Sequence, residues 1–266
     1  FEHMNLRCLV SQTNTGIPRG CAISSFLAEL YLSKIDKQIK EEIGEIAYYN
    51  RYVDDIIIII HPSQIPTYKK SINDYKCTIE GIFNQKGLTL SKEKTQLIKS
   101  FGNPVYSIEI LGYEFVVKGN NVETQHTKVK NEKMYKRLDA VFTRFDKLLK
   151  CDYKSAKSYL FDALRILTAN TNLHNNKKRI KIGAYYSNQI LDDSSVLSLY
   201  DNYLAKKIES ISLSITGFSS EVERTMEEAE LKSVLLKNAS FVKGFDSRKR
   251  FCISKQRLQY IKNTWL

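Results

Sequence analysis

The first half of the chain alternates between two kinds of hydrophobic pattern. Apolar residues recur at helical spacing over residues 22–39 and again over residues 70–85, which predicts two amphipathic helices. Between these helices, two β-rich runs, 47–53 and 56–60, flank the pair Asp54-Asp55, which is the pattern of a β-hairpin.

Further β-structure is predicted towards the middle of the chain. Residues 88–90 and 95–98 have the composition of extended segments, and residues 110–117 followed by Gly119-Asn120-Asn121 predict a second hairpin.

The pattern becomes helical from about residue 128. Apolar stripes over residues 130–149, 155–167 and 194–211 predict three amphipathic helices, and Ser220 with Glu223 has the spacing of a capping box before a fourth. We therefore expect an α+β fold in two domains. Residues 1–120 would form an antiparallel sheet with helices, and residues 121–266 an all-α region.

Composition is that of a globular protein kept in a reducing compartment. The chain has 266 residues, of which 42% are hydrophobic, so it can bury a core and is not of the disordered class. No apolar run approaches the ~18–20 residues of a membrane helix, and we recognise no signal peptide. The five cysteines are odd in number and scattered, which argues against a disulfide framework and predicts a cytoplasmic location.

Charge is concentrated in the second half. The formal net charge is +12, and residues 1–127 contain equal numbers of basic and acidic residues, so the whole excess lies in residues 128–266. Such a distribution indicates that the second half binds a polyanion, although a basic surface of solvated lysines gives the same count.

The pair Asp54-Asp55 is the first candidate for chemistry. Two adjacent carboxylates at a stiff turn repel each other, and a divalent cation relieves that repulsion. Such a pair suits Mg²⁺-assisted phosphoryl transfer. The alternative is structural, because aspartate is favoured in turns of any kind.

Three further segments accompany this turn. A glycine-flanked loop, Thr15-Gly16-Ile17-Pro18-Arg19-Gly20, opens into the first predicted helix. Downstream lie Gly87-Leu88-Thr89-Leu90 with Lys94-Thr95, and then Leu111-Gly112-Tyr113-Glu114-Phe115. Taken in order with Tyr52-Val53-Asp54-Asp55, these segments resemble the palm of reverse transcriptases. The resemblance covers about the first 120 residues.

The resemblance implies an RNA-directed DNA polymerase that uses two Mg²⁺ ions, dNTPs, an RNA template and a DNA product. It assigns metal binding to Asp54 and Asp55 and a catalytic role beside the leaving pyrophosphate to Lys94. It assigns contacts with the incoming nucleotide and the template to Gly16, Ile17, Pro18, Arg19, Gly20 and Tyr52. It assigns the primer grip to Leu111, Gly112 and Tyr113.

The sequence departs from the family pattern in two ways. Arg19 and Ser24-Ser25 stand where the family usually has glutamine and Ser-Pro, which affects substrate recognition. The third carboxylate that these polymerases need has no counterpart before Gly16, so we expect it, with the fingers, in a longer protein of which this chain is a piece.

The second half offers three basic regions for nucleic acid. The helix over residues 130–149 is expected to face phosphates with a row of basic side chains, including Lys130, Lys133 and Arg137. A dense basic run follows at Lys177, Lys178, Arg179 and Lys181. Arg165 lies before this run and Tyr185-Tyr186 after it, a mixture that suits a folded RNA or a single strand. Residues 247–262 form a basic tail that could lie on phosphates, or simply be solvated.

The region from Leu164 to Asn188 resembles the C-terminal part of bacterial defence-associated reverse transcriptases, related to retron and abortive-infection enzymes. This resemblance implies antiphage defence with a non-coding RNA, and a homo-oligomer or a second protein as partner. Two other functions remain open: a catalytically inactive module that binds RNA or a partner, and a polymerase that makes DNA without a nucleic-acid template.

Overall fold

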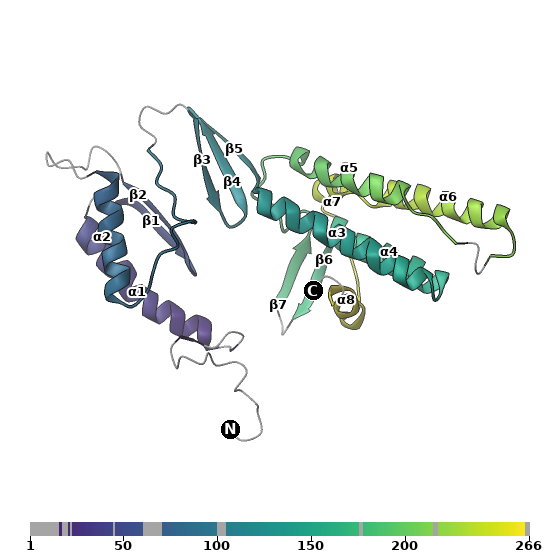
Figure 1. Ribbon diagram of the computed structural model, residues 1–266, viewed down its shortest axis with the longest axis horizontal. Helices are drawn as coiled ribbons and strands as arrows, with labels where there is room; N and C mark the ends of the chain where they lie inside the picture. The colour runs from purple at the N-terminus through teal and green to yellow at the C-terminus, as the bar shows by residue number, and fades with distance from the viewer. Residues whose placement is uncertain are drawn as a thin grey trace, which may run out of the picture. The chain divides into compact units, whose positions relative to one another are not determined.

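The chain forms two compact units, which we describe separately. The computed structural model describes residues 16–17, 21, 23–44, 46–60, 71–99, 105–175, 178–214 and 218–263, with the side chains of 173–179 and 262 excepted. The units are Phe1–Pro104 and Val105–Leu266 (Figure 1). The division at residues 120 and 121 expected for the functional domains differs from this compact division, because the hairpin that follows residue 105 belongs to the second unit.

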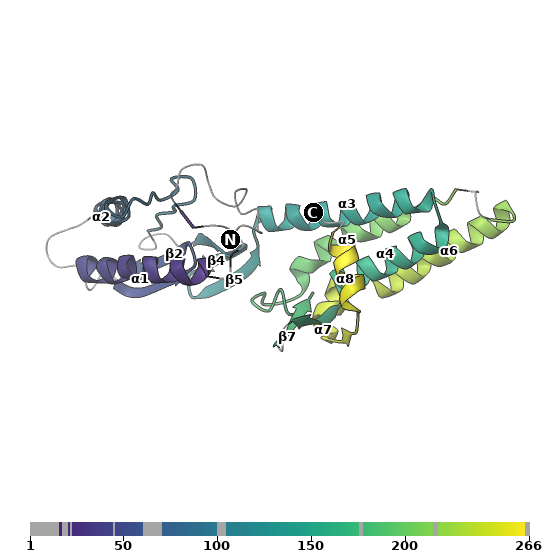
Figure 2. The ribbon, with the colours of Figure 1, turned by 90° about the horizontal axis from the view of Figure 1, so that it is seen from below.

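The first unit places two helices on one face of a hairpin. Helix α1 spans Ser24–Ile43, strands β1 and β2 span Ile46–Tyr52 and Asp55–Ile60, and helix α2 spans Ile72–Gln85. Figure 2 shows α1 running along this hairpin. The predicted helices and hairpin are confirmed, whereas residues 88–90 and 95–98 form no strand.

Only alternate positions of the hairpin contribute to the core of the first unit. Ile56, Ile58 and Ile60 pack against the buried residues of the two helices, because successive side chains of a strand point to opposite faces. The buried residues of the helices are Ile35, Ile39, Ile43, Tyr75, Ile82 and Phe83.

The other face of the hairpin is open. Ile59 and Tyr48 are about half exposed, at 50% and 48%. The first half of the predicted apolar stripe of α1 is exposed as well, including Phe26 and Leu30. Only one face of the hairpin is therefore covered by the core of the first unit.

The second unit begins with a three-stranded antiparallel meander. Its strands are β3 (Val105–Ile110), β4 (Tyr113–Lys118) and β5 (Asn121–His126). The β4–β5 hairpin is the one predicted from Gly119-Asn120-Asn121.

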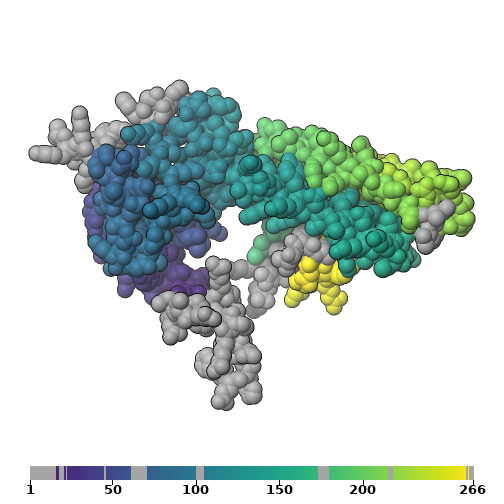
Figure 3. All heavy atoms as spheres, viewed as in Figure 1, coloured from purple at the N-terminus to yellow at the C-terminus, as the bar shows by residue number. Residues whose placement is uncertain are grey.

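Six helices follow in this unit, in the part that the structure describes. They are α3 (Lys128–Leu149), α4 (Tyr153–Thr168), α5 (Ser195–Glu209), α6 (Glu221–Asn238), α7 (Phe241–Ser247) and α8 (Lys255–Lys262). Helices α3 to α6 form a long helical layer, which appears in teal and green in Figure 3. None of the described helices has both the length and the apolar character needed to cross a membrane.

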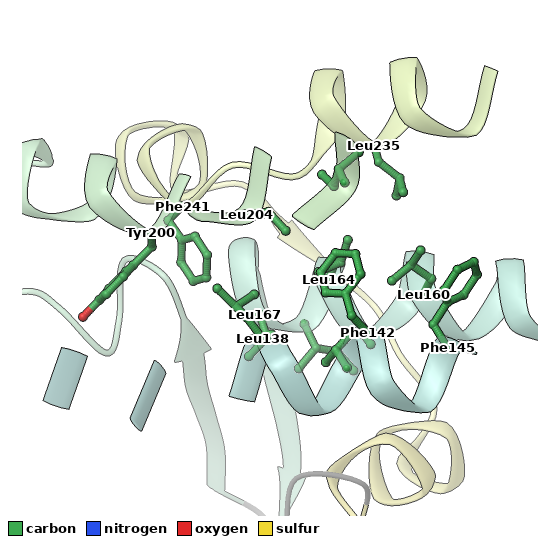
Figure 4. Packing of buried hydrophobic residues seen from close by; sticks show 14 of the residues in the cluster. Leu138, Phe142, Phe145, Leu160, Leu164, Leu167, Tyr200, Leu204, Leu235 and Phe241 are labelled. Atoms are coloured by element: carbon green, nitrogen blue, oxygen red, sulfur yellow. The ribbon is translucent and has the colours of Figure 1, made fainter. Parts of the chain in front are cut away.

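The core of the second unit is formed mainly by α3, α4 and α5, and α6, α7 and α8 add buried residues to it (Figure 4). The stripe predicted on α3 is confirmed by the burial of Leu138, Val141, Phe142 and Phe145. Helix α4 is buried more extensively and contributes Leu160, Leu164 and Leu167 from the side facing α3. Ser220 caps α6 by accepting a hydrogen bond from the Glu223 amide, as its spacing predicted.

A second sheet corrects the expectation of an all-α region. Strands β6 (Asn170–Asn175) and β7 (Lys178–Gly183) form an antiparallel hairpin, and β8 (Arg250–Phe251) pairs in parallel with β6. Three asparagines and two lysines stand among the twelve strand residues, and both types are depleted in strands, so the residue types gave only a weak β signal. The pairing of β6 with β8 joins residues about eighty apart, which a local pattern does not reveal.

Candidate active site

The two candidate metal ligands lie at the tip of the β1–β2 hairpin. Tyr52 pairs with Asp55, so Val53 and Asp54 form a two-residue loop. Such a loop requires a positive φ at its first position, which is normally supplied by glycine or asparagine. Here Val53 adopts a φ of 58°, which is a strained conformation for a β-branched residue. Asp54 and Asp55 are exposed beside it.

Arg51 holds this strained loop through a hydrogen bond to its backbone. Its Nη1 donates a hydrogen bond to the carbonyl oxygen of Val53, at 2.9 Å. Its other bonds reach two acids of α1: Nη2 lies 2.7 Å from Glu29 Oε1 and 2.9 Å from Asp36 Oδ2. The Arg51 side chain is only 4% exposed. A single guanidinium thus ties the loop that carries Asp54 to α1.

The acid that receives Arg51 is held in its charged form. Burial acts to raise the pKa of Asp36, but the hydrogen bonds from Arg51 and Tyr49 outweigh it and lower that pKa. The Tyr49 hydroxyl donates to Asp36 Oδ1 at 2.6 Å, and burial together with this bond raises the pKa of Tyr49. The bonds from Asp36 and Glu29 raise the pKa of Arg51. Both partners of the ion pair are therefore charged at neutral pH.

Lys94 is presented on a short turn of the first unit. The turn closes where the Thr95 amide and hydroxyl both donate to the Ser91 carbonyl oxygen, at 3.0 and 2.7 Å. Lys94 is exposed on it, so the Thr of the Lys-Thr pair has a structural role. No hydrogen bond or ion pair among the described residues joins Lys94 to Asp54 or Asp55.

The glycine-flanked loop is described only at its start. Gly16 has a φ of +99°, which favours glycine, and Ile17 is 41% exposed. Pro18, Arg19 and Gly20 lie outside the described residues, so their predicted contacts with nucleotide and template stay predictions. Tyr52, the remaining residue of this group, is 64% exposed beside the loop of the hairpin.

The predicted primer grip is a second strained hairpin loop, and it belongs to the second unit. Ile110 pairs with Tyr113, so Leu111 and Gly112 form a two-residue loop in which both residues have a positive φ, 51° and 81°. This is the pattern of a type I′ turn. The Gly112 carbonyl oxygen accepts from the Thr127 amide, which ties the loop to the start of α3.

Lys130 lies against this loop instead of facing solvent. A Cβ built on Gly112 would lie 3.3 Å from Lys130 Cδ, and Lys130 Nζ lies 3.4 Å from the centre of the Tyr113 ring. Burial lowers the pKa of Lys130 to about 8. The structure therefore brings Lys130, a predicted phosphate contact, together with Gly112 and Tyr113 of the predicted primer grip.

A buried histidine lies next to Tyr113, beside the same loop. His126 is 4% exposed and lies between Tyr200 and Asn188, with its ring nitrogens 2.8 Å from Tyr200 Oη and 2.9 Å from Asn188 Oδ1. Burial, and next the charge of Lys130, lower the pKa of His126 to about 4. The imidazole is therefore neutral near pH 7, and it donates from Nε2 to Asn188.

The other predicted phosphate contacts divide between two places. Lys133 and Arg137 are exposed on α3, as expected, and no ion pair recorded for the described residues engages either of them. Lys181 is exposed on β7. Lys177 lies outside the described residues, and for Lys178 and Arg179 the structure describes the backbone alone, as part of β7.

The donors at the Asp54-Asp55 hairpin suit Mg²⁺ bound together with a substrate. Mg²⁺ in phosphoryl-transfer sites takes one or two carboxylates and completes its shell with water and phosphate oxygens. Asp54 and Asp55 supply this set. Among the described residues, no group of three His, Cys, Asp or Glu side chains is placed to hold a metal ion. The carboxylates therefore fit an ion shared with a nucleotide better than an ion held by protein alone.

Sequence reasoning missed Arg51 and His126. Arg51 directly precedes the Tyr52-Val53-Asp54-Asp55 segment, but a single arginine in a strand carries no pattern. The one available signal was its inward-facing position beside an apolar strand, where a charge needs a partner. His126 gave no signal, because a lone histidine carries no pattern.

The first part of the chain matches a known protein family. Residues 4–115 match the model of the family described as Reverse transcriptase (RNA-dependent DNA polymerase). The match ends inside β4, so it includes the Asp54-Asp55 hairpin and the Leu111-Gly112 loop and covers less than half of the chain. No curated protein matches the chain, and no solved structure matches it.

Proposed function

We propose, from the premise that residues 4–115 belong to the reverse transcriptase family, that the chain supplies the catalytic hairpin of an RNA-directed DNA polymerase. The family match supports this activity. The observation that carries the proposal is the geometry of Asp54 and Asp55: two exposed carboxylates at the tip of a hairpin whose strained loop is tied by Arg51 to α1.

In this proposal, Asp54 and Asp55 hold Mg²⁺ together with the phosphates of a dNTP. Two bound Mg²⁺ ions would activate the primer 3′-hydroxyl and neutralise the triphosphate. The chain's own contribution is to hold the two carboxylates in one place. The hydrogen bond from Arg51 to the Val53 carbonyl supplies this rigidity, because a positioned donor set costs no reorganisation during reaction.

The other site residues take supporting roles in the same proposal. Lys94 offers a cation for the leaving pyrophosphate. Gly16, Ile17 and Tyr52, with Pro18, Arg19 and Gly20, contact the incoming nucleotide and the template. Leu111, Gly112 and Tyr113 contact the primer, and Lys130 stiffens their loop. Lys133 and Arg137 on α3 contact the phosphates of the template–primer duplex.

We also propose the narrower role of a bacterial antiphage enzyme that works with a non-coding RNA. Its support is the sequence resemblance of residues 164–188 to defence-associated reverse transcriptases. The partners would then be an RNA template, dNTPs and the DNA product, with a second copy or a second protein in the assembly.

Primer extension tests the catalytic proposal. The purified protein is incubated with Mg²⁺, dNTPs and a primer on an RNA template, and Asp54→Asn is compared with Asp146→Asn. Asp146 is an exposed aspartate on α3 and serves as the matched control. We expect Asp54→Asn to slow extension at least about a hundredfold, because metal-assisted charge stabilisation contributes several kcal/mol. The control should extend normally.

The product identifies the reaction. A DNA strand complementary to the RNA template supports the proposal. Extension that is unchanged in Asp54→Asn removes this residue from catalysis, and synthesis that persists without any template supports the template-free alternative instead.

A further inference from the structure

The second sheet joins two basic regions that are far apart in the sequence. Strand β8 pairs in parallel with β6, with Asn170 opposite Arg250 and Thr171 opposite Phe251. The tail that starts at residue 247 is therefore next to the β6–β7 hairpin and the turn at Tyr185-Tyr186. Cations and aromatic rings that contact one another therefore gather in this region, which we call the aromatic–basic surface. Its residues are Arg165, Lys181, Tyr185, Tyr186, Arg248, Arg250 and Phe251, of which Phe251 also packs against the core.

A buried asparagine holds this surface together. Asn170 is fully buried, and its Nδ2 donates to the Gly244 carbonyl oxygen at 2.7 Å, in the middle of α7, and to the Lys249 carbonyl oxygen at 3.3 Å. Its Oδ1 accepts from the Tyr185 amide at 2.9 Å. The two segments that carry the aromatic rings and the cations are thus fixed to each other through one side chain.

Three cations of the surface lie over aromatic rings. The Arg248 guanidinium lies 4.3 Å from the centre of the Tyr185 ring, and the Arg165 guanidinium lies 4.4 Å from that of Phe251. Lys181 Nζ lies 5.5 Å from the centre of the Tyr186 ring. An arginine that rests flat on a ring keeps its outer face and its N–H edge free for a further planar group and a phosphate.

The charges of this surface are not neutralised within the protein. Arg165, Lys181, Arg248 and Arg250 are exposed, and none of them takes part in an ion pair that the structure records among its described residues. The carboxylate of Asp246, two residues before Arg248, accepts a hydrogen bond from the Ser194 hydroxyl at 3.4 Å. Several exposed cations close together stabilise a bound polyanion.

Arg248 itself is held in a strained conformation. It follows the last residue of α7 with a φ of 53°, a region that favours glycine. Residues other than glycine are strained at such positions, and they persist where the surrounding contacts hold them. Here the conformation brings the guanidinium over the Tyr185 ring.

We propose that the aromatic–basic surface binds single-stranded nucleic acid, with bases stacking on Arg248 and Tyr186 and phosphates contacting Lys181 and Arg250. A duplex keeps its bases inside and offers only phosphates, so it would leave the planar groups unused. The surface belongs to the second compact unit and the Asp54-Asp55 hairpin to the first, and the proposed binding needs neither Mg²⁺ nor dNTPs.

Fluorescence anisotropy tests this proposal on the full chain, freed of bound nucleic acid, at fixed salt and without Mg²⁺. The probes are short labelled oligouridylate, oligothymidylate and a duplex of the same length. We expect at least one single strand to bind about tenfold more tightly than the duplex. Comparing uridylate with thymidylate shows whether the surface takes RNA, DNA or both. Equal or tighter binding of the duplex would overturn the proposal.

Variants of Arg248 separate binding from folding. Arg248→Gly removes the guanidinium at a position where glycine relieves the backbone strain, so folding is not the confounding effect. We expect it to weaken single-strand binding about fivefold or more, since a lost stacking contact has that magnitude. Arg248→Lys keeps the charge but not the plane, and should also weaken binding. Lys237→Ala removes an exposed charge from the end of α6 and should change affinity less than about twofold.

Variants of Tyr186 test the same surface in the same assay. Tyr186→Phe keeps the ring and should bind as the wild type does, whereas Tyr186→Ala should lose about fivefold or more. If Arg248→Gly and Tyr186→Ala bind no worse than Lys237→Ala, the proposed surface is wrong. Asp54→Asn should bind single strands normally, so a failure of this proposal is distinguishable from a failure of the catalytic one.

Discussion

At the scale of single residues, strain identifies the candidate functional positions. Within the described part of the chain, three residues other than glycine have a positive φ: Val53, Leu111 and Arg248. They lie at the catalytic hairpin, the predicted primer grip and the aromatic–basic surface. Strained backbone of this kind is retained where surrounding contacts outweigh its cost, and it is enriched at functional sites.

Arg51 is the residue whose removal should be most damaging in the first unit. Arg51→Met leaves Asp36 without its charged partner and frees the Val53 carbonyl, so we expect a loss of about 3–5 kcal/mol in the free energy of unfolding. Arg51→Lys keeps the charge but cannot reach all three acceptors, and should lose less. Hydrogen exchange in α1 and β1 measures both.

The control for Arg51 is Lys37→Met on the same helix. Its side chain is 78% exposed, and its ion pair with Glu41 is 3.7 Å long, so its removal should change stability by less than about 0.5 kcal/mol. An Arg51→Met variant as stable as this control would show that the loop needs no brace.

His126 should make the second unit sensitive to acid. Histidine titrates near 6.5 when unfolded, and burial lowers the pKa of His126 to about 4. Above pH 6.5 both states are neutral and stability is complete. As the pH falls from 6.5 to 4, the unfolded chain binds a proton that the folded chain refuses, so stability falls by about 3 kcal/mol.

A variant isolates this contribution. His126→Gln cannot titrate, so between about pH 7 and pH 4.5 it should lose roughly 2–3 kcal/mol less than the wild type in urea unfolding. The same acid-induced loss in both proteins would assign the pH dependence to other groups.

At the scale of helices and strands, close packing limits what one glycine tolerates. A Cβ on Gly244 of α7 would lie 1.7 Å from the Thr168 carbonyl oxygen at the end of α4. Gly81 of α2 has open space at the same position and no positive φ. The two glycines therefore form a matched pair for testing how α7 packs on α4.

We expect the two substitutions to change stability in opposite directions. Gly244→Ala should destabilise the second unit by about 3 kcal/mol or more, because backbone must move. Gly81→Ala should stabilise α2 by roughly 0.5–1 kcal/mol, because alanine loses less conformational freedom in a helix. Thermal unfolding of the two variants measures both effects. A Gly244→Ala variant of wild-type stability would contradict the close approach of α7 and α4.

The elements also show where a local pattern is sufficient. The hairpin around Asp54-Asp55, the helix that became α3 and the cap at Ser220 were all predicted, because each depends on residues a few positions apart. The β6–β8 pairing was not predicted, and neither was the contact of Lys130 with Gly112 and Tyr113. Both depend on which elements the fold brings together.

At the scale of the whole molecule, the candidate metal ligands and the excess of positive charge lie in different parts of the chain. The candidate metal ligands lie in the first compact unit, and the whole formal excess of +12 lies after residue 127, in the second. Each unit has its own hydrophobic core. This division fits a protein in which one part performs phosphoryl transfer and another binds a long polyanion, because counterion release depends on the number of phosphates contacted.

The sequence alone was sufficient for the order of the motifs, the hairpin that carries Asp54 and Asp55, and the excess of positive charge. The motifs and the hairpin depend on residues a few positions apart, and the charge is a count of residues. Tertiary structure decided that Arg51 braces the loop, that Lys130 packs on Gly112 and Tyr113, and that Arg248 rests on Tyr185. Burial and partnership of a charged side chain depend on residues that only folding brings within a few ångströms, and no local pattern encodes that distance.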